Sequence, residues 1–195
     1  MTNKNTIYND RDLYVLDHSL IQNLKHKALQ SKEKRYRFCL HHSNEHLTQE
    51  MIIIFHIDTI LTPHRHPIGR SESYHIIEGT MNQYFFDDNA NIIKAIKLGE
   101  KENNKKFYYR LSSHTWHLPV PTSEFVVYHE TITGPFINDD DIEYPKWRDK
   151  FNSKEKINKL SSVWNSNKLD AEDTDAIWRW MDLFVNISVR YQQAD

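Results

Sequence analysis

A succession of short strand-like segments separated by polar turns constrains the fold of this chain more than any other feature. Residues 50–57 are nearly continuous in apolar and β-branched side chains, which is typical of a buried strand. Tyr84-Phe85-Phe86 and Ile92-Ile93 flank a turn rich in Asp and Asn, which is a strong hairpin signal. Further strands are expected at residues 73–78, 80–86, 107–111 and 124–131. Many short strands with regularly spaced turns predict an all-β core, an antiparallel barrel or jelly roll.

The segment before these strands has the pattern of a helix. Asp17 is a predicted N-cap, and apolar residues follow it at helical spacing. These residues are Leu20, Ile21, Leu24 and Ala28. Lysines 25, 27, 32 and 34 then form a basic stretch, which we interpret as an exposed helix end rather than a binding patch.

The chain becomes helical again after Pro145. A short helix is expected to carry Phe151, Ile157, Leu160 and Val163. Asp173 or Thr174 is expected to cap a longer helix whose apolar residues cover more than one stripe. They are Ile177, Trp178, Trp180, Met181, Phe184, Ile187, Val189 and Tyr191. A helix that is apolar over a wide arc must bury more than one face, so it either packs on the barrel alone or also forms a homodimer contact.

A length of 195 residues suits one domain with appendages. We therefore divide the chain into an N-terminal helical segment (1–34), a barrel domain (35–147) and a C-terminal helical extension (148–195). Only four glycines and six prolines are present, so no flexible linker is expected between these parts.

Composition excludes several classes of partner. The formal net charge is −2 without a sustained basic block, so no nucleic acid is expected. The longest apolar run, residues 51–55, is too short to span a membrane, and the N-terminal ten residues lack the apolar core of a signal peptide. The single cysteine, Cys39, excludes an internal disulfide and suits a reducing compartment, so a cytoplasmic location is expected. A lone strand cysteine is more often a small buried hydrophobe than a ligand or nucleophile.

The sequence Pro63-His64-Arg65-His66-Pro67 indicates a metal site. Two histidines two residues apart share a face of a β-strand, and Glu72 can return to that face through a short turn. His117 is the best candidate for a fourth ligand. Nitrogen and oxygen ligands in this number leave coordination positions open on a divalent ion, and Zn, Fe, Mn and Ni all fit such a set. The alternative for Glu72 is a carboxylate that orients a histidine ring.

Other residues are candidates for the chemistry around the metal. Glu130 lies on the last predicted strand and is the candidate catalytic base or, alternatively, a partner that orients a ligand. Arg37 and Arg110 are candidates for binding an anionic substrate, and the alternative for each is an ordinary ion pair on the surface. Tyr74 shares parity with Glu72, so it either lines the pocket or packs in the core.

The spacing of His64, His66, Glu72 and Gly79 resembles the first motif of the cupin superfamily, and His117 stands where the second motif places its histidine. Asp58 replaces the usual glycine before the first histidine, and the gap between His66 and Glu72 is longer than usual. From about residue 35 to 147 the chain more narrowly resembles the WbuC-type cupin-fold metalloproteins. The blocks that carry this resemblance are Arg37-x-Cys39-Leu40-His41, Gln49-Glu50-Met51-Ile52, Pro63-His64-Arg65-His66-Pro67, Phe85-Phe86-Asp87-Asp88, Trp116-His117 and Glu130-x-x-x-Gly134-Pro135-Phe136.

The resemblance implies a cupin double-stranded β-helix with one divalent metal ion inside the barrel and His41 at the pocket rim. It also implies a link to bacterial surface-polysaccharide biosynthesis and a sugar-related small-molecule ligand. Isomerase, epimerase and oxygenase chemistry all remain open at this point. Two alternatives are a non-catalytic module, in which the metal staples the barrel and the C-terminal helices dimerise or bind a partner, and a metal-free isomerase with histidines as acid and base.

Overall fold

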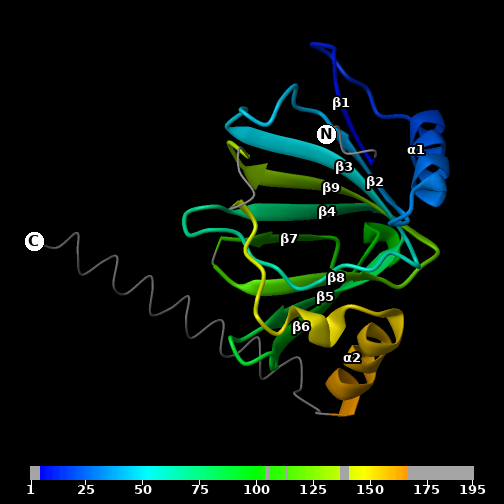
Figure 1. Ribbon diagram of the computed structural model, residues 1–195. Coiled ribbons are helices and arrows are strands. Elements are labelled where there is room, and N and C mark those ends of the chain that lie inside the picture. Colours follow the sequence, from blue (N-terminus) through cyan, green and yellow to red (C-terminus); the bar gives the residue numbers. More distant parts are fainter. Residues whose placement is uncertain (1–4, 104–105, 113, 137–140, 167–195) are drawn as a thin grey trace, which may run out of the picture. The chain divides into compact units, whose positions relative to one another are not determined.

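A computed structural model describes residues 5–103, 106–112, 114–136 and 141–166 (Figure 1). Its strands are β1 (Thr6–Tyr8), β2 (Arg35–Cys39), β3 (Thr48–His56), β4 (Glu72–Glu78), β5 (Thr80–Phe86), β6 (Ile92–Gly99), β7 (Tyr108–Leu111), β8 (Trp116–Pro121) and β9 (Phe125–Thr133). Its helices are α1 (His18–Gln30) and α2 (Lys154–Ser166), with 3-10 turns at Lys101–Asn103 and Arg148–Phe151.

The strands form two sheets that enclose an apolar interior. One sheet has the order β1-β2-β3-β9-β4-β7 and the other has the order β6-β5-β8. Every strand pair is antiparallel except β1 with β2, which are parallel. The chain passes from one sheet to the other between β4 and β5, at Gly79. The predicted all-β core of antiparallel strands with an N-terminal helix is therefore confirmed.

Strand β3 is buried on both faces, which explains its nearly continuous apolar sequence. Ile52 and Ile54 pack with residues of α1, including Leu24 and Ala28. The alternate residues of β3 point into the barrel interior. Figure 1 shows α1 beside β2 and β3, on the outer side of the larger sheet. The opposite face of this sheet is consequently the one that forms the interior of the barrel.

Helix α1 begins as the sequence predicts but buries one lysine that was expected to be exposed. The Asp17 carboxylate accepts a hydrogen bond from the Leu20 amide, so Asp17 is the N-cap. Lys25 is only 9% exposed and pairs with Glu78, and its ammonium lies over the Phe125 ring. The prediction of a wholly solvated basic stretch was wrong at this position, because a lysine can bury its stem when a carboxylate meets its head.

Three strands, β1, β2 and β8, lie outside the ranges expected from the sequence, and the histidine segment is not a long strand. β8 contains two prolines and the edge strand β1 has only three residues, so neither shows strong alternation. Residues 64 and 65 form isolated bridges to His117 and Glu143. The predicted long helix after residue 173 lies outside the described residues, and so does the proposed dimer contact.

The chain divides into two units, residues 1–157 and 158–195. The predicted boundaries at residues 34 and 147 remain predictions. Within the described part of the chain, no helix combines the length and the apolar character needed to cross a membrane.

Candidate metal centre and cavity

The backbone holds three histidines against one another. The amide of His64 donates to the carbonyl of His117 at 3.1 Å, and the amide of His117 donates to the carbonyl of His64 at 2.8 Å. Arg65 makes the equivalent pair of bonds with Glu143, at 3.0 and 2.9 Å. His64 and His66 therefore share one side of this extended segment, and Arg65 takes the other. One ring nitrogen from each of the three histidines lies within 4.8 Å of the other two.

Each of the three imidazole rings is oriented by a backbone carbonyl. The Nδ1 atoms of His64, His66 and His117 contact Thr62 O at 3.2 Å, Asp141 O at 3.1 Å and Thr115 O at 3.0 Å, respectively. A carbonyl oxygen only accepts, so each Nδ1 must carry its hydrogen. The lone pair of each ring then resides on Nε2, which is the tautomer that a metal ligand needs.

Glu72 completes the cluster from β4. Its Oε2 lies 3.3 Å from His66 Nε2, and its Oε1 lies 3.3 Å from His117 Nε2. The hydroxyl of Tyr109 donates to Oε1 at 3.0 Å. Glu72 is 1% exposed and His117 is 0% exposed. The sequence-predicted residues His64, His66, Glu72 and His117 are thus brought together.

The polar atoms of this cluster fit a metal ion. Glu72 Oε2 and the Nε2 atoms of His66 and His117 are buried without a hydrogen-bond partner among the described residues. Leaving such atoms unsatisfied is costly. Ligands bonded to one ion at about 2.0–2.2 Å lie at most about 4.4 Å apart, and the 3.3 Å contacts fall within that limit. The three histidines can hold a metal ion, and Glu72 adjoins two of them.

The charges of the cluster favour an ionised Glu72 carboxylate, a neutral His64 and a proton on His117 that faces Glu72. Burial lowers the pKa of His64 well below its usual value, and the neighbouring His117 and His66 lower it further. Burial alone would raise the pKa of Glu72, but His117 and His66 outweigh it and hold that pKa well below the usual range. Burial opposes charge on His117, yet Glu72 raises the pKa of His117. A bound cation would replace this proton as the partner of the carboxylate.

A cavity of about 570 Å³ adjoins the cluster. The sequence-predicted residues that line it are Arg37, His41, His64, His66, Tyr74 and Glu130. Arg110 is exposed and does not line the cavity, because its neighbours Tyr109 and Leu111 take the inward side of β7. Arg35 and Tyr128 also line the cavity and were missed. For Arg35 a signal existed, since it lies two residues before Arg37 and shares its parity on the strand.

Among the cavity groups with displaced pKa values, Glu130 and Cys39 bear most directly on reactivity. Burial, with the charge of Glu72 in second place, raises the pKa of Glu130 to about 7. Such a carboxyl group can accept or release a proton near neutral pH. Burial also raises the pKa of the Cys39 thiol to about 11. Cys39 is 2% exposed and belongs to the apolar interior, which agrees with a packing role rather than a nucleophilic one.

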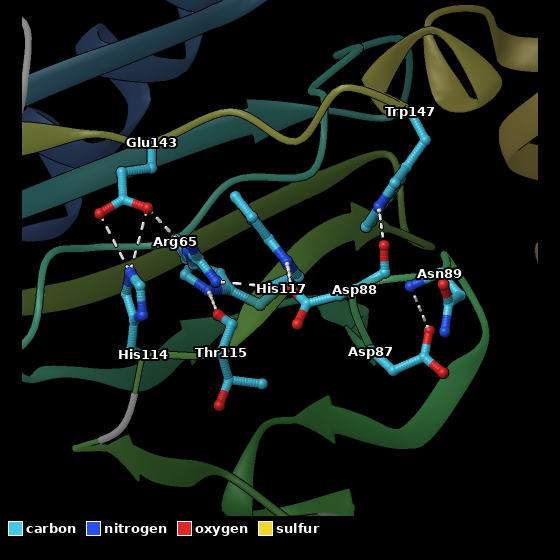
Figure 2. A network of polar contacts seen from close by, with 10 residues as sticks. Arg65, Asp87, Asp88, Asn89, His114, Thr115, His117, Glu143 and Trp147 are labelled. Carbon is cyan, nitrogen blue, oxygen red and sulfur yellow. Dashed lines mark hydrogen bonds and ion pairs between the residues drawn. The ribbon is translucent and has the colours of Figure 1, made fainter.

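A polar network fixes the segment that contains Arg65 and His66. Figure 2 shows the Glu143 carboxylate between Arg65 and His114. The Arg65 guanidinium also lies 3.8 Å from the centre of the Trp116 ring. The same stretch of chain, residues 141–147, supplies the Asp141 carbonyl to His66 and the Trp147 indole to the Asp88 carbonyl. A remote segment therefore orients one of the candidate ligands.

Comparison with known proteins places this geometry in context. A family described as "Domain of unknown function (DUF6016)" matches residues 16–98. No curated protein matches the chain. A Klebsiella pneumoniae protein with a double-stranded β-helix domain is 13% identical, with a TM-score of 0.42, and the match covers 60% of this chain and 83% of that one.

Two further structures resemble the chain. A protein from Shewanella oneidensis is 11% identical, with a TM-score of 0.46, and the match covers 58% of this chain and 75% of that one. The capsular polysaccharide assembling protein CapF from Staphylococcus aureus is 14% identical, with a TM-score of 0.45. That match covers 57% of this chain but 29% of CapF, so this chain spans less than a third of CapF. At these identities no activity transfers from these proteins to the chain.

Proposed function

We propose that this protein binds one divalent metal ion through His64, His66, His117 and Glu72 and uses it to act on, or bind, a small polar molecule. The strongest support is the cluster of buried Nε2 and carboxylate atoms that have no hydrogen-bond partner among the described residues. Three imidazoles and one carboxylate suit Zn, Fe, Mn or Ni. When bound, such an ion polarises substrate oxygens as a Lewis acid.

The residues around the cavity have complementary roles in this proposal. His64 and His66 line the cavity as well as the metal cluster, so a molecule in the cavity has access to the metal. Glu130 accepts a proton from the ligand or donates one to it, which its raised pKa permits at neutral pH. Tyr74 and His41 line the wall, with His41 held by the Glu50 carbonyl at 3.0 Å.

The ligand class and the biological setting are part of the same proposal. The volume of the cavity falls in the range of small-molecule sites. A sugar-related ligand and a role in surface-polysaccharide biosynthesis follow from the WbuC-like blocks, with CapF as a distant structural parallel. We further propose a cytoplasmic location and a homodimer built by the C-terminal helices.

Access of solvent to the metal separates this function from that of a metal-stapled, non-catalytic module. The experiment is water-proton relaxation of the protein loaded with Mn²⁺, measured with and without added small molecules. The proposal expects relaxation enhancement from an exchanging water, because the cluster borders an open cavity. Bound Mn²⁺ that gives no such enhancement would contradict the proposal and support the stapled module.

A further inference from the structure

Two arginines project into the barrel from β2, where an interior would ordinarily be apolar. Side chains alternate along a strand, and Phe38 packs outward against α1 residues while Cys39 belongs to the interior cluster. Arg35 and Arg37 share the parity of Cys39. Both line the cavity that also contains His64 and His66.

Neither arginine side chain has a hydrogen bond or an ion pair with another described residue. Two other partly buried arginines of the barrel are paired: Arg65 with Glu143 and Arg70 with Asp141. A guanidinium carries five donors in a planar fork, and withdrawing it from water without a partner costs free energy. Burial accordingly lowers the pKa of Arg35. The fold pairs Arg65 and Arg70 and leaves Arg35 and Arg37 directed into a cavity.

No carboxylate among the described residues forms an ion pair with either arginine, although the charge of Glu33 acts on Arg35 from the rim. Glu130 stands on the same interior face, two strands away from β2, and its pKa of about 7 shows that Arg37 does not hold it firmly ionised. Glu33 lies at the exposed rim and accepts a hydrogen bond from the Asn5 amide. Without a ligand, the β2 side of the cavity therefore carries excess positive charge.

We propose that Arg35 and Arg37 form an anion subsite, so that the ligand of the cavity is a small acid whose carboxylate or phosphate is bound by β2 while its polar remainder faces the metal cluster. This inference rests on the proposed function and names the substrate class. Carboxylate and phosphate share the paired oxygens that a guanidinium binds in bidentate fashion. Three sugars that share the same ring distinguish the two kinds of anion: glucose has no charged group, glucuronate has a carboxylate, and glucose 6-phosphate has a phosphate.

The first experiment measures the affinity of these three sugars for the metal-loaded protein by calorimetry. Glucuronate or glucose 6-phosphate should bind at least about tenfold more tightly than glucose, since a charge-assisted bidentate pair supplies that much. Arg35→Gln and Arg37→Gln should each reduce this preference about tenfold, and the exposed Arg110→Gln is the matched control that should not. Preference for the carboxylate or for the phosphate identifies the source of the anion. No preference for either acid would overturn the subsite.

The second experiment does not depend on the identity of the sugar, because it uses inorganic phosphate as the probe. At constant ionic strength, phosphate in place of chloride should raise the thermal midpoint of the wild type but not that of the Arg35→Gln/Arg37→Gln double variant. The double variant should also unfold at a higher midpoint than the wild type without phosphate, because it lacks two unpaired charges. Equal phosphate shifts in both proteins would overturn the inference. Metal content is measured on every sample. A wild type that takes up no metal on reconstitution but keeps the arginine-dependent effect contradicts the metal proposal alone. A metal-loaded wild type without that effect contradicts the anion subsite alone.

Discussion

At the scale of single residues, Glu130 shows how position rather than residue type creates a reactive group. Its register partners are Met51 on one side and Tyr74 on the other, so the carboxyl group lies on the interior face of the sheet. Burial and the nearby carboxylate of Glu72 raise its pKa to about 7. An ordinary glutamate stays ionised at neutral pH, whereas this one is close to its midpoint.

Glu130 therefore makes the metal-free protein less stable as the pH rises. A carboxyl group whose pKa is raised in the folded state does not destabilise the fold below its ordinary pKa, near 4.5. Its destabilising effect is complete above about pH 7. Glu130→Gln should thus be more stable than the wild type at pH 8 by up to about 3 kcal/mol, and the difference should vanish near pH 4. Urea unfolding at both pH values measures this, with the exposed Glu45→Gln as the control for loss of one charge. A difference that is constant with pH would contradict it.

At the scale of elements, Gly79 allows β4 to continue into β5 in the other sheet. Its φ is +82°, and a β-carbon there would meet the Phe125 carbonyl oxygen at 2.0 Å. Gly69 has a similar φ of +89° but open space around it. Gly79→Ala should cost at least about 3 kcal/mol, whereas Gly69→Ala should cost about 1 kcal/mol from backbone strain alone. Denaturant unfolding of both variants measures the difference, and equal costs would contradict the steric explanation.

The segment of residues 141–147 is the second element on which the site depends. Arg65 connects it to the histidine segment through Glu143 (Figure 2), and Asp141 offers its carbonyl to His66. Arg65→Gln should weaken metal binding about tenfold without removing a ligand, since groups that orient ligands have effects of that size. Calorimetric metal titration tests this, and Arg11→Gln at an exposed position is the control. Unchanged affinity in Arg65→Gln would show that the segment does not orient His66.

How far the sequence predicted these elements depends on how local their signals are. The Asp17 cap and the hairpin of β5 and β6 are encoded by neighbouring residues, and both are confirmed. Pairings between distant strands and loops direct the Arg35 side chain into the barrel and bring residues 141–147 to His66. One sequence does not reveal such pairings. Arg110 illustrates the same limit: its residue type suits anion binding, but the register of β7 points it away from the cavity.

At the scale of the whole molecule, the two sheets bring together residues from distant parts of the chain. His117 comes from the smaller sheet, Glu72 comes from the larger one, and His64 and His66 come from the loop between β3 and β4. This convergence leaves buried nitrogen and oxygen atoms that a bound cation would satisfy. A metal bound across both sheets should therefore stabilise the folded state in proportion to its affinity.

Elemental analysis of the purified protein, after chelation and reconstitution with Zn²⁺, Mn²⁺, Fe²⁺ or Ni²⁺, tests the metal site most directly. We expect about one ion per chain in the wild type and in His75→Ala, whose side chain is exposed on the outer side of β4. His64→Ala/His66→Ala should retain less than about a tenth of an ion while keeping the β-rich circular dichroism of the barrel. Failure of the wild type to take up any of the four metals, or full metal content in the double variant, would contradict the account.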